Sequence, residues 1–208
     1  MFAIFHYSFI QNAFLAGSIV AVAAALLGYF LVIRGLTFAG HALSNIGFSG
    51  AAGAVLLGVQ PVYGLLVFTV AASLAIAVLG RELRERDVAI GVIMTFALGL
   101  GILFLSLYNG YAQQAYSILF GTILGISRED VLVTGLFSLL IIVSILILWR
   151  PLLFSSFDPE MAEARGVPQR AIAGIFLVLV ALTVSVAMQV VGVLLVFALL
   201  VGPPATAA

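Results

Sequence analysis

The chain has 208 residues, of which 64% are hydrophobic and 8% are charged, and its formal net charge is zero. Soluble globular proteins have about 45–50% apolar and about 25% charged residues, so this composition argues strongly against a soluble protein. The chain has no cysteine and no basic tract, which excludes disulfide frameworks, thiolate metal sites and a nucleic-acid partner. We therefore expect a protein of the lipid bilayer.

All charged side chains fall into four short clusters, Arg34, 81–87, 128–130 and 150–170. A charge buried in hydrocarbon is costly, so the uncharged runs between the clusters, about 20 residues each, predict membrane-spanning helices. We expect an all-α, polytopic transmembrane helical bundle that forms a single domain over residues 1–208. Residues 1–33 contain no Lys or Arg, so the first span is expected to be retained and not cleaved as a signal peptide. The spans are predicted near residues 12–33, 38–58, 61–80, 88–108, 130–149 and 171–189, with a further segment from Val190.

The second predicted span contains the only ionisable side chain in any span, His41. Ser44, Asn45 and Ser49 follow it at spacings that place all four residues on one helical face. These side chains either bond to neighbouring helices or line a substrate path. The second interpretation arises because intramembrane ionisable residues are candidates for function and imidazole is a common ligand of transition metals. Both interpretations stay open, since two side chains do not make a metal site.

The orientation of the bundle follows from its arginines, because short cytoplasmic loops are enriched in Arg and Lys. Placing the loops after the first, third and fifth spans in the cytoplasm puts every arginine except Arg128 inside. The N-terminus is then predicted to lie outside, and the loops 81–87 and 150–170 inside. The outer connection 109–127 is rich in glycine and polar residues and is expected to dip into the membrane without crossing it.

The loop 150–170 contains residues that begin and end a short helix. Asp158 suits the N-cap, Pro159 the first helical position, and Gly166 the left-handed conformation after the last turn. Glu160 and Glu163 belong to the N-terminal part of this helix, where negative charge is favoured. We expect a two-turn helix that either joins two spans or is gripped by a soluble partner.

Two features near the C-terminus have more than one interpretation. Gln189, near the outer end of the sixth span, is expected to pack, to snorkel toward the membrane surface or to line a vestibule. Gly202, Pro203 and Pro204 interrupt the last apolar run, either because the helix ends there or because a broken helix borders a transport route.

Four blocks, taken together, resemble the membrane subunit of zinc and manganese ATP-binding-cassette (ABC) importers, the ABC-3 family. They begin at Arg34 (RGLTFAGHALSNIGFSGAA), Asp87 (DVAIGVIMTFALGLGILFLSL), Leu119 (LFGTILGISREDV) and Phe157 (FDPEMAEARGV), and the last continues from Val191 (VGVLLVFALLVGPPATA). Their order and spacing across residues 34 to 207 make the resemblance specific.

The resemblance implies a permease in a bacterial plasma membrane, with an architecture similar to that of vitamin B12 and metal-chelate permeases. It implies a second copy of the permease, contact with membrane lipid, a cytoplasmic ATPase and a metal-binding lipoprotein or periplasmic protein outside. The partner would bind and hydrolyse ATP, since this chain has no G-x-x-x-x-G-K-[ST] motif, so we expect neither a cofactor nor an enzymatic activity here. The coupling helix that contacts the ATPase would be formed by Asp158, Pro159, Glu160, Ala162, Glu163 and Gly166.

The chain departs from the family pattern at two points. His41 stands where the family usually has Asp, and Asn45 where it usually has His, which removes an anionic metal ligand. We therefore expect His41 and Asn45 to make transient metal contacts, with Ser44 and Ser49 along the pathway. Members of the family also continue into further spans, so the sequence predicts a C-terminally incomplete permease.

The first functional hypothesis is the permease subunit of an ABC importer for zinc or manganese, with iron as a further cargo. One alternative is an ABC permease for a metal chelate or vitamin, which would need no fixed metal ligands. Another is a secondary carrier or channel that works without ATP. Such a carrier usually needs several intramembrane carboxylates or basic groups, and His41 is the only titrating side chain in the predicted spans.

Overall fold

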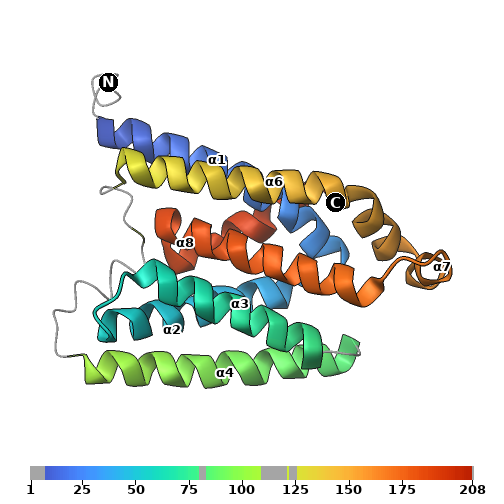
Figure 1. Ribbon diagram of the computed structural model, residues 1–208, viewed down its shortest axis with the longest axis horizontal. Coiled ribbons are helices and arrows are strands. Elements are labelled where there is room, and N and C mark those ends of the chain that lie inside the picture. Colours follow the sequence, from blue (N-terminus) through green and yellow to red (C-terminus); the bar gives the residue numbers. More distant parts are fainter. Residues whose placement is uncertain (1–7, 80–82, 109–120, 122–125, 208) are drawn as a thin grey trace.

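The computed structural model describes residues 8–79, 83–108, 121 and 126–207, and within these ranges the protein is all-α. Long helices run side by side along the molecule, and one short helix projects at one end (Figure 1). The helices are α1 (Ser8–Ile33), α2 (Thr37–Leu56), α3 (Pro61–Leu79), α4 (Leu83–Leu107), α6 (Arg128–Phe157), α7 (Pro159–Ala164) and α8 (Gln169–Ala207).

Five of these helices, α1, α3, α4, α6 and α8, are long and apolar enough to cross a membrane. This confirms the expected transmembrane helical bundle. The helix α2 has 20 residues but lower hydropathy, because it contains His41, Asn45 and several serines and glycines. Most of its residues from Ala39 to Val55 are buried, and it packs against α3, α4 and α8. Protein therefore surrounds α2 over much of its length, which allows it to be more polar than a helix that faces lipid.

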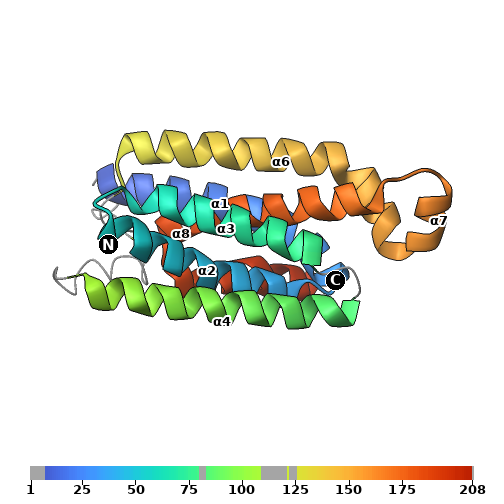
Figure 2. The same ribbon diagram turned by 60° about the horizontal axis from the view of Figure 1, so that its bottom comes forward.

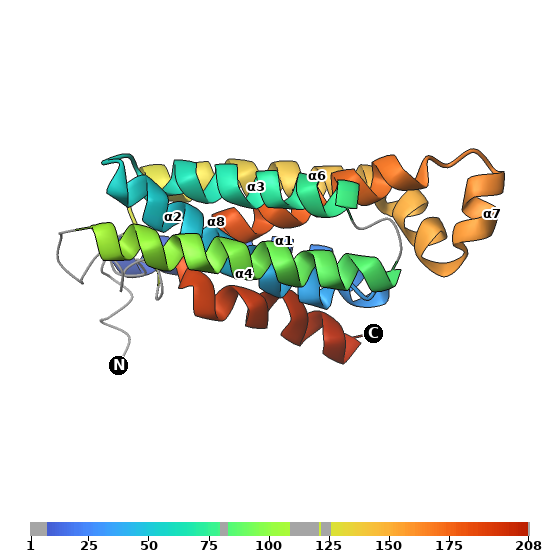
Figure 3. The same ribbon diagram turned by 90° about the horizontal axis from the view of Figure 1, so that it is seen from below.

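The helix α8 consists of two halves joined at Gly192, where φ is 77° and ψ is 168°. Only glycine adopts such a positive φ at little cost, so this residue allows the break. The two halves run in opposite directions, and the chain returns toward the end at which α8 began (Figure 3). The sequence placed a boundary between segments at Val190, two residues before this break. The connection 109–127 lies almost entirely outside the described residues.

The two ends of the bundle differ in charge. At one end α1 finishes, α4 begins and α7 projects beyond the long helices (Figures 1 and 2); we call this the α7 end and the other the distal end. Arg34, Arg86 and the loop 150–170 belong to the α7 end, whereas Arg128 lies at the distal end, where α6 begins. The asymmetry of arginine that the sequence suggested is therefore an asymmetry between two faces of one bundle. The side on which the N-terminus lies stays a prediction.

Candidate functional site

His41 and Asn45 lie one turn apart on α2 and bond to each other; we call them the α2 pair. The Nδ2 of Asn45 donates to the carbonyl oxygen of His41 at 3.0 Å and lies 3.2 Å from its Nε2. An amide nitrogen donates and does not accept, so Nε2 accepts and the ring proton belongs on Nδ1. In this arrangement the lone pair of Nε2 is already engaged.

The α2 pair lies on an open side of the helix. His41 is exposed and Asn45 is half-buried. The rings of His41 and Phe197 form an edge-to-face contact, with their centroids 5.0 Å apart and their planes at 73°. Phe197 belongs to the second half of α8, so sequence spacing gave no sign of this contact.

Ser44 and Ser49 lie on the flanks of the α2 pair and are both buried. The Ser44 hydroxyl donates to the carbonyl of Gly40 at 3.0 Å, and the Ser49 hydroxyl donates to the carbonyl of Asn45 at 3.5 Å. Both hydroxyls thus bond within their own helix. Of the four residues that the sequence placed on one face, only His41 and Asn45 reach the open side.

The capacity of this region to hold a resident metal ion is small. Among the described residues no group of three or more His, Cys, Asp or Glu side chains could hold a metal ion. The α2 pair offers one imidazole nitrogen that is already bonded and one amide oxygen. Tightly held transition metals usually have three or four protein ligands, so this donor set suits a passing contact.

The short helix α7 has the caps that the sequence predicted. The Oδ1 of Asp158 accepts from the backbone N–H of Met161 at 2.9 Å, and Pro159 is the first residue of the helix. Gly166 takes a φ of 80° just after the helix ends. On α7, Ala162 is fully buried whereas Glu160 and Glu163 are exposed. The helix therefore packs through one small side chain and presents two carboxylates to the outside.

Arg34, in the turn between α1 and α2, connects the start of α2 to the base of α7. Its Nε donates to the Ser156 hydroxyl at 3.0 Å, and its Nη2 donates to the Ser155 hydroxyl. The guanidinium also lies over the ring of Phe176 on α8, 5.4 Å from its centroid. Burial lowers the pKa of Arg34, and the positive charge of Arg86 lowers it further, but a guanidinium keeps its charge at physiological pH. We call Arg34 with these two serines the Arg34 clamp.

Sequence reasoning used Arg34 only to orient the chain. Its isolation was the available signal, since it is the only charge in its loop. Its partners come from the last turn of α6, more than 100 residues along the chain, and no spacing rule connects the two segments. The clamp joins the helix that carries the α2 pair to the end of the helix that leads into α7.

Comparison with known proteins identifies the family. The model of the family described as the ABC 3 transport family matches residues 6–208. The chain belongs to this family. It is 38% identical over 205 residues to the manganese transport system membrane protein MntC of Halalkalibacterium halodurans, which covers 97% of this chain and 69% of the relative. It is 32% identical to the manganese import system permease protein ScaB of Streptococcus parasanguinis, over 97% of this chain and 72% of the relative.

Solved structures agree with this assignment. The structure of PsaBC from Streptococcus pneumoniae in complex with Fab matches with a TM-score of 0.83 and 32% identity, over 97% of this chain and 73% of the other. An inward-facing structure of a putative metal-chelate type ABC transporter matches with a TM-score of 0.66 at 22% identity, which concerns the fold alone. The resemblance seen in the sequence is thus confirmed. The chain is a multi-pass membrane permease of the ABC 3 family, which is a transport subunit.

Proposed function

We propose that this permease carries a divalent transition metal ion into the cell, with Mn²⁺ as the first candidate and Zn²⁺ or Fe²⁺ as alternatives. The observation that supports this most strongly is the family match over residues 6–208, together with relatives named for manganese transport. The proposed partners are a cytoplasmic ATPase, an extracytoplasmic metal-binding lipoprotein or periplasmic protein, and a second copy of the permease. ATP is bound and hydrolysed by the ATPase, and this chain binds no cofactor.

The α2 pair contacts the passing ion. Rotation of the Asn45 carboxamide releases Nε2 of His41 and turns the amide oxygen toward the cation, so that both side chains contribute one donor atom. Both donors are neutral, and a neutral pair binds a divalent cation more weakly than a pair that includes a carboxylate. Weak contact favours transport, because an ion must leave a conducting site as readily as it enters.

The helix α7 is the coupling helix, and the α7 end faces the cytoplasm of a bacterial plasma membrane, which places the N-terminus outside. Its exposed Glu160 and Glu163 dock against the ATPase. The Arg34 clamp supports this assignment, since two hydrogen bonds tie the end of α6, just before α7, to the start of the helix that carries His41. Movement of α7 is therefore passed to α2 through direct contacts.

The docking proposal is tested by replacing Glu160 and Glu163 with Lys. Reversal of two exposed charges should weaken co-purification of the ATPase by at least about tenfold while the melting temperature of the permease changes little, because exposed charges contribute little to stability. Glu129→Lys at the distal end is the matched control and should leave co-purification unchanged. Normal recovery of the ATPase with the double variant would count against α7 as the docking helix.

The pathway proposal is tested by His41→Ala in cells that depend on this system for manganese. Loss of one donor atom should lower Mn²⁺ uptake by about tenfold, which corresponds to about 1.4 kcal/mol. Expression in the membrane and ATPase recovery should be normal. Uptake equal to that of the wild type would remove His41 from the ion path.

A metal chelate is the second candidate, because the α2 pair contains no carboxylate, is internally bonded and offers no fixed set of ligands. Competition experiments separate the two cargoes. If free Mn²⁺ is carried, excess unlabelled Mn²⁺ reduces uptake of the radioactive ion, and strong chelators abolish it. If a chelate is carried, adding the chelator increases uptake.

A further inference from the structure

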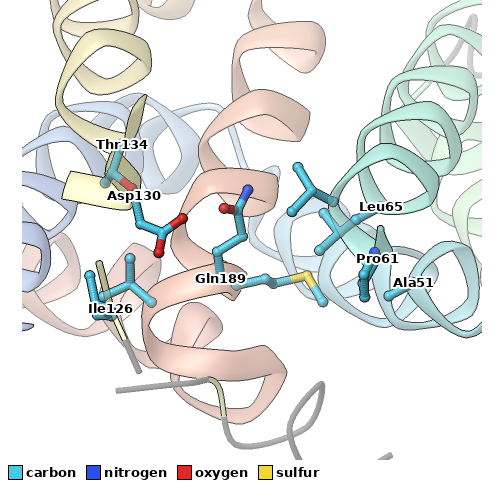
Figure 4. Close-up of a pocket in the computed structure, with 10 residues that line it drawn as sticks. Ala51, Pro61, Leu65, Ile126, Asp130, Thr134 and Gln189 are labelled. Carbon is cyan, nitrogen blue, oxygen red and sulfur yellow. The ribbon is translucent and has the colours of Figure 1, made fainter. Parts of the chain in front are cut away.

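A cavity of about 190 Å³ opens at the distal end between α3, α6 and α8. Asp130 and Thr134 of α6 lie on one side of it, Gln189 of α8 projects from the middle, and Pro61 lies on the opposite side (Figure 4). A smaller cavity shares Thr134 and Gln189 with it as lining residues. The α2 pair takes no part in either.

Two hydroxyls on α6, those of Thr134 and Ser138, have no hydrogen-bond partner in the part of the chain that the structure describes. Asp130, Thr134 and Ser138 follow at intervals of four residues, so they form one stripe that runs from the cavity mouth into the bundle; we call it the α6 stripe. Thr134 is 3% exposed and lines the cavity, yet among the described residues its hydroxyl has no hydrogen-bond partner. Ser138 is 1% exposed, and its Oγ is likewise buried without a partner.

This state is unusual within the molecule. The other buried serine and threonine side chains that the structure describes donate to a carbonyl of their own helix. An unpaired buried hydroxyl costs free energy, so native proteins usually pair it with protein or with a ligand or water. Thr134 lines both cavities and so points to a polar guest there, whereas Ser138 lies one turn deeper and lines neither cavity.

The chemistry of the lining selects the guest. Asp130 supplies a carboxylate at the mouth, whose Oδ2 accepts from the backbone N–H and the hydroxyl of Ser127, at 2.9 and 2.7 Å. Thr134 and Gln189 add a hydroxyl and an amide oxygen, and none of the cavity's lining residues carries a positive charge. Oxygen donors with one carboxylate suit a hard divalent cation that keeps most of its water. A cavity of about 190 Å³ is large enough to hold several waters, so it has room for a cation that keeps part of its hydration shell.

We propose that this cavity is an outer binding site for a hydrated divalent cation, held by the Asp130 carboxylate and by the oxygens of Thr134 and Gln189. The proposal rests on the proposed function and extends it to the step before the α2 pair. Met188 supports a position of the cavity next to α2. Its side chain lines the cavity, and its sulfur would lie 2.7 Å from a Cβ placed on Gly47 of α2. The cavity thus abuts the helix that carries His41, about 9 Å along its axis from that residue.

Mn²⁺ itself is the probe, and its binding to the full chain in lipid nanodiscs is followed by electron paramagnetic resonance. Asp130→Asn keeps the size of the side chain and removes the charge, and it should weaken Mn²⁺ binding by at least about tenfold. Glu129→Gln is the matched control, because Glu129 precedes Asp130 on the same turn and does not line the cavity. It should change binding less than about twofold.

Thr134→Val separates binding from folding. Removal of an unpaired hydroxyl at constant shape should raise the melting temperature, whereas loss of a donor should weaken Mn²⁺ binding by a few-fold. A higher melting temperature together with weaker Mn²⁺ binding cannot arise from misfolding. Equal effects of Asp130→Asn and Glu129→Gln, or no saturable binding to the wild type, would overturn the site. His41→Ala should leave this binding intact while lowering uptake, so the site and the proposed function can fail separately.

Discussion

The α2 pair and the α6 stripe both consist of polar residues four positions apart on a membrane helix. They differ in whether their polar groups have hydrogen-bond partners. On α2, Asn45 bonds to His41, and the flanking serines bond to their own helix. On α6, the hydroxyls of Thr134 and Ser138 have no partner among the described residues. The same spacing therefore gives two arrangements: the polar side chains on α2 bond to one another or to their own helix, whereas two hydroxyls on α6 have no partner among the described residues.

Ser138→Ala should have the largest effect on stability in this comparison. The buried Oγ has no partner, so its removal should stabilise the bundle by about 1–2 kcal/mol. Thermal unfolding of the purified permease measures the change. A lower melting temperature would mean that Ser138 is paired, and the contrast between the two helices would not hold at this position.

Asn45→Leu should change stability in the other direction. The variant loses two hydrogen bonds to His41 and should unfold with about 1 kcal/mol less free energy. It also leaves Nε2 of His41 without its donor, so the imidazole resonances should shift in NMR spectra. An unchanged melting temperature together with an unchanged imidazole spectrum would show that Asn45 and His41 are not bonded to each other.

Ser44→Ala should have the smallest effect. The Ser44 hydroxyl donates only to the carbonyl of Gly40, and that bond within one helix contributes little, so the change should be less than about 0.5 kcal/mol. Mn²⁺ uptake should also be near that of the wild type, because the side chain is buried beside the α2 pair. A strong loss of uptake with normal stability would place Ser44 on the ion path.

The sequence predicted features that depend on neighbouring residues. Clusters of charge indicated where helices end, and Asp158, Pro159 and Gly166 indicated a short capped helix, because caps and turn residues act over a few positions. His41 and Asn45 were found in the same way, since spacing along one helix is visible in the sequence. Their mutual hydrogen bond follows from that spacing.

Features that join distant segments could not be predicted. The bonds of Arg34 to Ser155 and Ser156 and the contact of His41 with Phe197 connect helices far apart in the chain. The unpaired hydroxyl of Thr134 is also a tertiary property, because most buried threonines in this bundle bond to their own helix and the sequence does not say which will not. The packing of helices against one another determines these contacts, and the periodicity of the sequence gives no information about that packing.

ATP-driven accumulation of Mn²⁺ in proteoliposomes that contain the permease, its ATPase and its binding protein tests the proposed transport most directly. Radioactive Mn²⁺ should accumulate against its gradient with ATP, stay near the background without ATP, and accumulate about tenfold less with His41→Ala. Accumulation that needs a chelator, or that proceeds equally without ATP, would contradict an ABC importer of the free ion.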